Sequence, residues 1–326
     1  MTQRGARHSL PAASADRVPI VAVVGATASG KTALSLDLAE SLGGHIINTD
    51  AMAVYRGMDI GTAKPSVAER RGITHHLLDF LDVTEPLTVA EFQARARAVI
   101  ADLRAEAVTP VLVGGSPLYT RAVLDQFDFP GTDPAVRARL EAELEAGGEA
   151  PLRARLADRD PVAESRIELG NGRRIVRALE VIEITGKPFS ARLPKAEYAD
   201  PRSIQIGVAI DRAALAARIE QRVEAMFEAG LVDEVAGLIE AGLLESRTAA
   251  VAIGYREVAA HLAGVLTLAE AQDKTIAATR KFARRQDSWF RNDPRVVWVD
   301  HDDPARVVKA LAAIAAVAQQ PDRAQD

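Results

Sequence analysis

The sequence predicts an α/β protein with a P-loop NTPase-like parallel sheet flanked by helices and with an inserted all-helical subdomain. Three observations predict this fold. A short apolar run at residues 18–24 leads directly into a G-x-x-x-x-G-K-[ST] loop at residues 25–32. Further along the chain, short apolar runs typical of strands alternate with helical patterns, both before and after one long segment. That segment, residues 133–199, has helix-start signals and no strand pattern.

The first third of the chain predicts a βαβ unit followed by another helix and strand. Short apolar runs indicate buried strands, and a Thr-x-x-Glu capping box at Thr88 indicates the start of the second helix. In order, we expect a strand at residues 18–24, a helix at Lys31–Leu42, a strand at residues 45–50, a helix from Thr88 to about Ala107 and a strand at Pro110–Val113.

Capping residues predict where the helices of residues 133–199 and of the last third of the chain begin. Asp133 and Asp160 each precede a proline, a pattern typical of a helix N-terminus, and Asn171 is a third candidate cap. Beyond this segment we expect a strand at residues 203–210, a helix from Asp211 to Ala229, a helix of about 25 residues from Thr267 to Arg291, a strand at residues 296–299 and a C-terminal helix.

Composition excludes several classes of protein. The 326 residues include no cysteine, which excludes disulfides, thiolate zinc sites and a cysteine nucleophile. No apolar run approaches the ~18 residues of a membrane span, and no secretory signal is evident. We therefore expect a cytoplasmic protein, by default a monomer. The expected parts are a catalytic core at residues 18–125 and 200–318, a helical insertion at 126–199, and disordered ends at 1–17 and 319–326.

The loop at residues 25–32 predicts a site for a di- or triphosphate. Its backbone N–H groups and the following helix N-terminus suit an anion, Lys31 would neutralise a terminal phosphate, and the Thr32 hydroxyl would hold Mg²⁺. The strand at Pro110–Val113 ends in two glycines and Ser116, without the aspartate of many hydrolases. Transfer with diphosphate as the leaving group is therefore plausible. The loop residues are Gly25, Ala26, Thr27, Ala28, Ser29, Gly30, Lys31 and Thr32.

With this loop, a series of motifs resembles the tRNA dimethylallyltransferase (tRNA isopentenyltransferase) family, in its bacterial form without a zinc finger. The motifs occur in the family's order and extend from about Val21 to Trp298. They are DAMAVYRGMDIGTAKP at residues 50–65, HHLLD at 75–79, VGGSPLY at 113–119, RRIVRALEVIE at 173–183, RIEQR at 218–222, IGYR at 253–256 and RQDSW at 285–289.

The resemblance implies a reaction and a set of roles. The substrates are dimethylallyl diphosphate, held by the phosphate loop with Mg²⁺, and a tRNA anticodon stem-loop. Asp50 takes a proton from the exocyclic amine of the adenosine on the 3′ side of the anticodon. Thr27 lies beside the reacting centre, and Arg218 or Arg222 lies near the diphosphate. The implied tRNA contacts are Asp50, Ala51, Met52, Ala53, Ser116, Arg137, Arg173, Arg174, Arg177, Arg284, Arg285, Trp289 and Arg291.

Three positions depart from the family's pattern. Many members have serine where this chain has Ala51, a glutamine near Ala53 and threonine at Ser116. Ser116 keeps a hydroxyl. The two alanines lose polar groups that would orient the base and Asp50, whereas the class of reaction is unaffected.

The residues also support this function without the family. An aromatic amine needs a base within hydrogen-bond reach, and Asp50 follows a strand next to the phosphate loop. The formal net charge is −5, so RNA binding needs locally concentrated cations. Residues 280–291 carry five cations against one carboxylate, and residues 173–177 carry three arginines. A solvated charged face is the alternative for such runs.

Other residues and functions stay open at this level. Tyr55 and Tyr119 either line the isoprenoid pocket or fill the core, and His75 with His76 favours structural hydrogen bonding over a metal site. A small-molecule kinase using ATP and an adenylate isopentenyltransferase acting on free nucleotides are the enzymatic alternatives. A non-catalytic P-loop RNA-binding switch is the alternative from another class, although it would not require Asp50.

Overall fold

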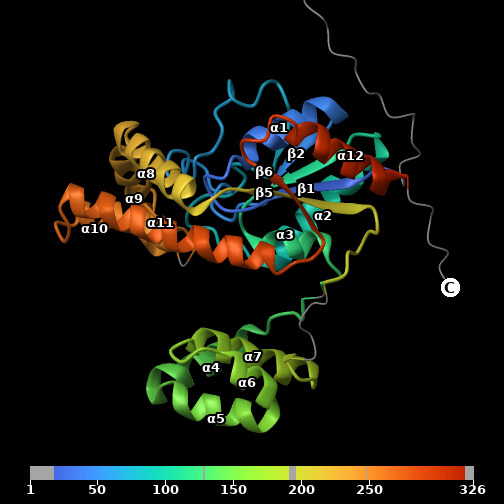
Figure 1. Cartoon of the computed structure of the whole chain (residues 1–326). Helices are drawn as coiled ribbons and strands as arrows, with labels where there is room; N and C mark the ends of the chain where they lie inside the picture. The colour runs from blue at the N-terminus through green and yellow to red at the C-terminus, as the bar shows by residue number, and fades with distance from the viewer. Residues whose placement is uncertain (1–17, 128, 191–195, 247, 320–326) are drawn as a thin grey trace, which may run out of the picture. The chain divides into compact units, whose positions relative to one another are not determined.

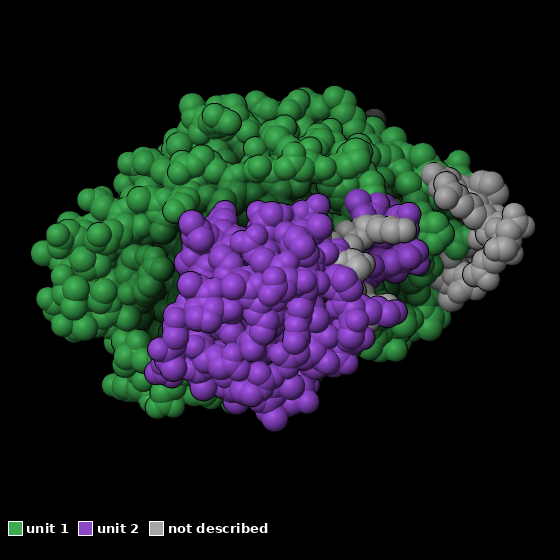
Figure 2. Space-filling model, turned by 90° about the horizontal axis from the view of Figure 1, so that it is seen from below, with its two compact units in different colours: residues 1–124, 200–326 green, residues 125–199 purple. Residues whose placement is uncertain are grey.

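The computed structural model describes residues 18–127, 129–190, 196–246 and 248–319. The chain divides by its internal contacts into two compact units, which Figure 2 colours separately. Unit 1 is Met1–Leu124 with Asp200–Asp326, and unit 2 is Asp125–Ala199. The disorder expected at residues 1–17 and 319–326 falls outside the described residues except at Gln319. In the part that is described, no helix is long and apolar enough to cross a membrane.

Unit 1 is built on a six-stranded sheet in the order β3-β2-β4-β1-β5-β6, with every pair parallel. The central strand β1 has all five residues buried, as the apolar run predicts. Because the strands are parallel, their carboxyl ends lie at one edge, where ligands bind in open α/β sheets. The strands are β1 Ile20–Val24, β2 His45–Asn48, β3 His75–His76, β4 Pro110–Val113, β5 Ser203–Ala209 and β6 Val296–Asp300.

Helices cover both faces of this sheet (Figure 1). α1 Lys31–Leu42 and α12 Arg306–Ala318 pack on one face, where Leu38, Val21, Ile206 and Ile314 share a single apolar cluster. α2 Val89–Ala105 and α3 Pro117–Leu124 lie on the other face. The capping box predicted at Thr88 is confirmed, since its side chain accepts from Glu91 N and Glu91 bonds back to Thr88 N.

A group of helices beside the sheet carries one side of the functional site. Leu215, Ile219 and Val223 of α8 pack against Ile276 and Ala283 of α11 and against Ala26 and Ala28 of the phosphate loop. The caps predicted at Asp211 and Thr267 are both present. The helices of this group are α8 Arg212–Glu228, α9 Leu231–Glu240, α10 Tyr255–Leu262 and α11 Leu268–Arg291, with short 3-10 turns at Leu243–Glu245 and Ala249–Val251.

Unit 2 is a small helical bundle with its own apolar core. Leu140, Leu156, Ile175 and Leu179 are fully buried in it. The predicted caps at Asp133, Asp160 and Asn171 each accept a hydrogen bond from the following backbone. Its helices are α4 Pro134–Gly147, α5 Glu149–Arg159, α6 Pro161–Arg166 and α7 Gly172–Thr185.

Several predicted boundaries and omissions are corrected by the structure. The strand expected at residues 45–50 ends at Asn48, because the Asn48 side chain bonds both the N–H and the carbonyl of Asp50 and turns the chain. The first strand begins at Ile20, two residues late. The short strand β3 and the helices α3, α9 and α10 were not predicted.

Candidate active site

The phosphate loop joins β1 to α1 at the carboxyl edge of the sheet. Three of its residues adopt positive φ, namely Gly25 at 137°, Ala28 at 63° and Gly30 at 101°. A Cβ at Gly25 would lie in tight contact, 3.1 Å from the Val208 carbonyl oxygen, and the positive φ itself favours glycine there. The buried Ser29 hydroxyl has no hydrogen-bond partner in the described residues. An unpaired donor in this loop suits an anionic ligand.

Lys31 lies in the first turn of α1 and points back into the loop. Its ammonium donates to the Ala26 carbonyl oxygen at 2.6 Å. Burial and, second to it, repulsion from Arg222 lower the pKa of Lys31 to about 7, although the Asp50 carboxylate acts in the opposite direction. A diphosphate at this position would stabilise the charged form.

Asp50 follows β2 and is held by a local network. One carboxylate oxygen, Oδ1, accepts from Met52 N at 2.8 Å, while Asn48 fixes the Asp50 backbone. The other oxygen, Oδ2, accepts no hydrogen bond from the described residues. Asp50 therefore caps its own turn and keeps one oxygen available for a proton.

Two arginines of α8 approach the phosphate loop. The Arg222 guanidinium donates to the Thr27 hydroxyl at 3.4 Å, and Arg218 donates to the Ser29 carbonyl oxygen at 3.4 Å. They are one helical turn apart on the same face. Burial, followed by repulsion from Arg218, lowers the pKa of Arg222 from its ordinary value. An anion between them would relieve that repulsion.

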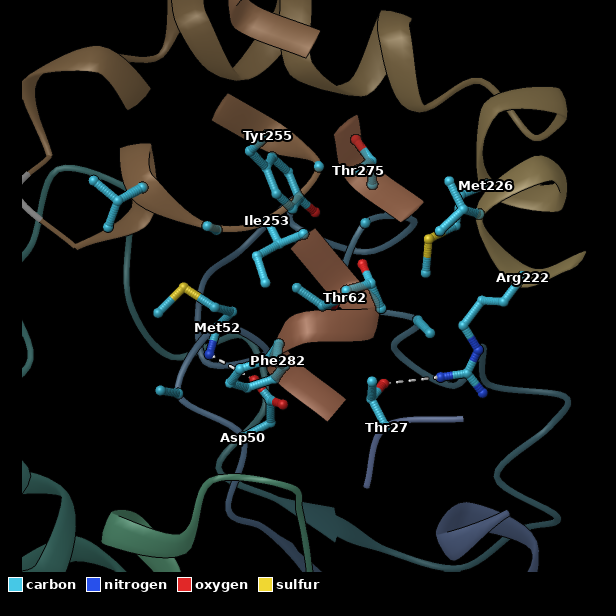
Figure 3. A pocket seen from close by; sticks show the side chains of 18 of the residues that line it. Thr27, Asp50, Met52, Thr62, Arg222, Met226, Ile253, Tyr255, Thr275 and Phe282 are labelled. Atoms are coloured by element: carbon cyan, nitrogen blue, oxygen red, sulfur yellow. Dashed lines mark hydrogen bonds between the residues drawn. The ribbon is translucent and has the colours of Figure 1, made fainter. Parts of the chain in front are cut away.

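Of these groups, Thr27, Asp50 and Arg222 line a cavity of about 370 Å³ in unit 1, whereas Lys31 and Arg218 do not (Figure 3). Thr27, Asp50 and Arg222 lie toward one end of it, and Tyr255 and Met226 toward the other. The cavity thus has a polar end beside the phosphate loop and an opposite, mainly apolar end, although Thr62, Thr248, Thr275 and Thr279 also line it. The apolar and aromatic lining residues are Met52, Val223, Met226, Leu231, Val251, Ala252, Ile253, Tyr255 and Phe282.

The apolar end is shaped by Glu234 of α9. Its carboxylate accepts from the backbone N–H groups of Asp59, Ile60 and Gly61 and from the Tyr255 hydroxyl at 2.6 Å. Burial and this hydrogen bond raise the pKa of Tyr255. A Cβ at Gly61 would lie 2.4 Å from the Tyr255 ring, so the backbone and ring are in close contact. The cavity wall is therefore fixed by one carboxylate.

The structure brings only some of the predicted site residues to this cavity. Thr27, Asp50, Ala51, Met52, Ser116, Arg222 and Arg285 line it. Ala53 does not line the cavity and is buried, with 5% exposure. Tyr55 and Tyr119 do not line it: Tyr55 is fully buried, and Tyr119 packs edge-on against Phe92. Of the two roles considered for these tyrosines, the core role is confirmed.

The basic residues of α11 divide into two groups. Arg284 and Arg285 are exposed, and Arg285 also reaches the cavity. Arg280 and Arg291 instead form ion pairs with Glu220 at 2.6 Å and Asp287 at 2.9 Å. Trp289 is 49% exposed, with the Arg121 guanidinium 5.7 Å from its ring.

The arginines of unit 2 divide in the same way. Arg173 and Arg174 are exposed at the start of α7. Arg137 and Arg177 both bond the carboxylate of Glu180, whose side chain is fully buried. Burial raises the pKa of Glu180, but the hydrogen bonds from these two arginines lower it below its ordinary value overall. Arg137 and Arg177 are therefore already committed to a buried carboxylate.

Metal ligands are sparse in the described residues. No group of three or more His, Asp and Glu side chains there is arranged to hold an ion. His76 bonds His45 across the strands at 3.2 Å, and His75 bonds the Ile73 carbonyl oxygen, so the structural interpretation of this pair is confirmed. Thr32 is exposed in the first turn of α1. A hydroxyl beside a phosphate site fits Mg²⁺ that arrives on a diphosphate.

Two functional residues were not predicted. Glu234 shapes the apolar end, and the buried Gln286 bonds both the phosphate loop and the turn after β4. Each has a polar side chain whose hydrogen bonds join segments far apart in the sequence, which a single sequence does not distinguish from a solvated side chain. Gln286 did lie within the RQDSW motif, although no role was attached to it.

Comparison with known proteins identifies close relatives. Residues 53–293 match the family model described as IPP transferase. A tRNA dimethylallyltransferase from a Nocardioides species is 67% identical, over 92% of this chain and 97% of its own length. One from Salinispora arenicola is 56% identical, over 92% of this chain and 87% of its own.

Two solved structures are also similar to this chain. The tRNA isopentenylpyrophosphate transferase of Bacillus halodurans is 39% identical with a TM-score of 0.69, covering 92% of this chain and 96% of its own. A eukaryotic dimethylallyltransferase solved acting on tRNA is 23% identical with a TM-score of 0.77, covering 91% and 77%. The latter shows likeness of fold alone.

Proposed function

The chain belongs to the IPP transferase family, and on that premise we propose that it transfers a dimethylallyl group from dimethylallyl diphosphate to tRNA, releasing diphosphate. The acceptor is the exocyclic amine of the adenosine on the 3′ side of the anticodon. One observation carries the proposal: Asp50, which follows β2, and Thr27, which belongs to the phosphate loop, line the polar end of a cavity whose other end is mainly apolar. Such a cavity suits a carboxylate base, a diphosphate and a short hydrocarbon together.

The geometry supports a direct displacement. The adenine nitrogen forms a bond to the first carbon of the allyl group while the carbon–oxygen bond to diphosphate breaks. The amine proton passes to Asp50 Oδ2, the oxygen that is not bonded to Met52. Lys31, Arg222 and the loop N–H groups stabilise the charge that develops on the diphosphate. The target base must leave its stack to reach the cavity, at a cost of a few kcal/mol.

We also propose that Mg²⁺ is the cofactor. When bound with the diphosphate, the ion would neutralise part of the leaving group's charge. The Thr32 hydroxyl would be the protein ligand that holds it. We further propose that the enzyme acts as a monomer in the cytoplasm.

Mass spectrometry of anticodon-loop fragments tests the proposed function. Unmodified tRNA incubated with the protein, dimethylallyl diphosphate and Mg²⁺ should yield one adenosine in which a dimethylallyl group replaces a hydrogen. Parallel reactions with ATP and with free adenosine monophosphate test the kinase and the adenylate isopentenyltransferase. Modification of free nucleotide but not of tRNA would overturn the proposal. Binding of tRNA without any modification would favour the RNA-binding switch.

We propose that the exposed arginines at the start of α7 and on α11 contact tRNA phosphates. Removing one phosphate contact makes the plot of log affinity against log salt concentration less steep, by about 1 in slope. Arg174→Ala combined with Arg284→Ala should therefore flatten the slope for tRNA binding by about 2, with little change in which tRNAs bind. Filter binding over a range of salt concentrations measures this.

A matched double variant controls for overall charge. Arg166→Ala with Lys309→Ala removes the same two charges, one exposed in each unit but outside the proposed clusters. It should leave the slope nearly unchanged. Equal slopes in wild type and in the Arg174/Arg284 variant would show that those arginines are ordinary solvated residues.

A further inference from the structure

Gln286 joins three parts of the site from the interior of α11. Its side chain is 2% exposed. The amide oxygen accepts from the Thr27 backbone N–H at 2.8 Å, and the amide nitrogen donates to the Gly115 carbonyl oxygen at 2.6 Å. Both ends of a buried amide are thus satisfied, and each partner lies far from Gln286 in the sequence.

The place of Gln286 on α11 puts it next to the reacting groups. Thr275, Thr279 and Phe282 line the cavity and share one face of the helix with Gln286, which follows Phe282 by one turn. Figure 3 draws Phe282 on the Asp50 side of the cavity, which Thr27 also lines. Gln286 therefore occupies the end of this face that meets the phosphate loop.

The close packing around Gly115 fixes how the amide is oriented. A Cβ at Gly115 would lie 2.3 Å from the Gln286 amide nitrogen, so only glycine permits this approach. With the nitrogen held on Gly115, the oxygen must face Thr27. One loop N–H is consequently bonded to protein instead of to phosphate, and the Thr27 side chain is left to meet Arg222 at the cavity.

We propose that Gln286 is a positioning residue that acts through Thr27: it fixes the loop backbone so that the Thr27 hydroxyl faces the reacting centre. The inference rests on the proposed function, because it assumes transfer at this cavity. Because the Thr27 N–H is bonded to Gln286, diphosphate binding should depend little on the Gln286 side chain. The transfer step should depend on that side chain strongly. A misplacement of about 1 Å can cost roughly 100-fold in rate.

The test compares Gln286→Met with wild type in single-turnover transfer at saturating substrates, together with inorganic diphosphate binding, tRNA binding and thermal unfolding. We expect a rate about 10- to 100-fold lower, with diphosphate affinity changed by no more than a few-fold. Gln286→Glu keeps an acceptor for the Thr27 N–H but loses the donor to Gly115. It gives a second, similarly shaped variant if Gln286→Met does not fold.

A double-mutant cycle with Thr27→Val separates positioning from a merely structural role. If Gln286 acts through the Thr27 hydroxyl, its substitution should cost far less in the Thr27→Val background than in wild type. Equal costs in both backgrounds, or lost thermal stability with an unchanged rate, would overturn the inference. Wild-type protein without transfer activity in the same assay would instead refute the proposed function.

Discussion

Asp50→Asn should lower the rate of dimethylallyl transfer by about 100- to 10,000-fold, the usual contribution of a general base. The substituted side chain keeps an oxygen for Met52 N and so preserves the turn that Asp50 caps. It does not keep a basic oxygen for the amine proton. Single-turnover kinetics at saturating tRNA and dimethylallyl diphosphate measure the effect on chemistry.

The Asp50 variant needs evidence that only chemistry has changed. Binding of tRNA and thermal unfolding should stay close to wild type, because the carboxamide is the same size as the carboxylate. Asp302→Asn, at a side chain that is 78% exposed, removes the same charge and should have no effect on rate. If Asp50→Asn retained activity within a few-fold of wild type while chemistry limits the rate, another group would have to be the base.

The sequence allowed the polar end of the cavity to be predicted because that end is built by local rules. A phosphate loop needs glycines at positive φ, a lysine and a hydroxyl at fixed spacing, and the loop must lie between a strand and a helix. Asp50 follows from the same logic, since the carboxyl ends of neighbouring parallel strands meet at one edge. Asn48 ended β2 early without disturbing this arrangement.

The apolar end was not predicted because it has no local pattern. Leu231, Val251, Ile253 and Tyr255 come from a helix start and from 3-10 and turn segments, where apolar residues have no regular period. They meet only because α8 to α11 pack together, and Glu234 joins the Tyr255 hydroxyl to the backbone N–H groups of Asp59, Ile60 and Gly61. Tyr55 and Tyr119 were equally plausible lining residues by composition, yet both belong to the core.

Electrostatic roles were the hardest to infer from sequence. Arg137 and Arg177 were grouped with Arg173 and Arg174 as tRNA contacts, but the first two bond the buried Glu180. The Glu180 carboxylate needs those partners because an unpaired charge is costly in an apolar core. Sequence shows the charge of each arginine, whereas only the fold shows which charges are already paired.

Lys31→Met should weaken binding of dimethylallyl diphosphate roughly 10- to 100-fold, as expected when a charged hydrogen bond to phosphate is lost. It should also remove a pH dependence. In the free protein the pKa of Lys31 is about 7, because burial and Arg222 disfavour its charge. A bound diphosphate favours that charge and raises the pKa, so binding above pH 7 must take up a proton.

The sign of the pH effect follows from that difference. Below pH 7 Lys31 is already protonated, so protonating it adds no free-energy cost to binding. Above pH 7 the wild-type affinity should fall by up to about tenfold per pH unit. Dimethylallyl diphosphate is itself almost fully ionised there, since the last ionisation of a phosphate ester has a pKa of about 6. Direct binding of dimethylallyl diphosphate between pH 6 and 9 measures the slope, with Lys309→Met, an exposed lysine, as the charge-matched control. Lys31→Met should give a flat profile above pH 7 while Lys309→Met follows wild type. A wild-type profile that is already flat would show that Lys31 is charged before the diphosphate arrives.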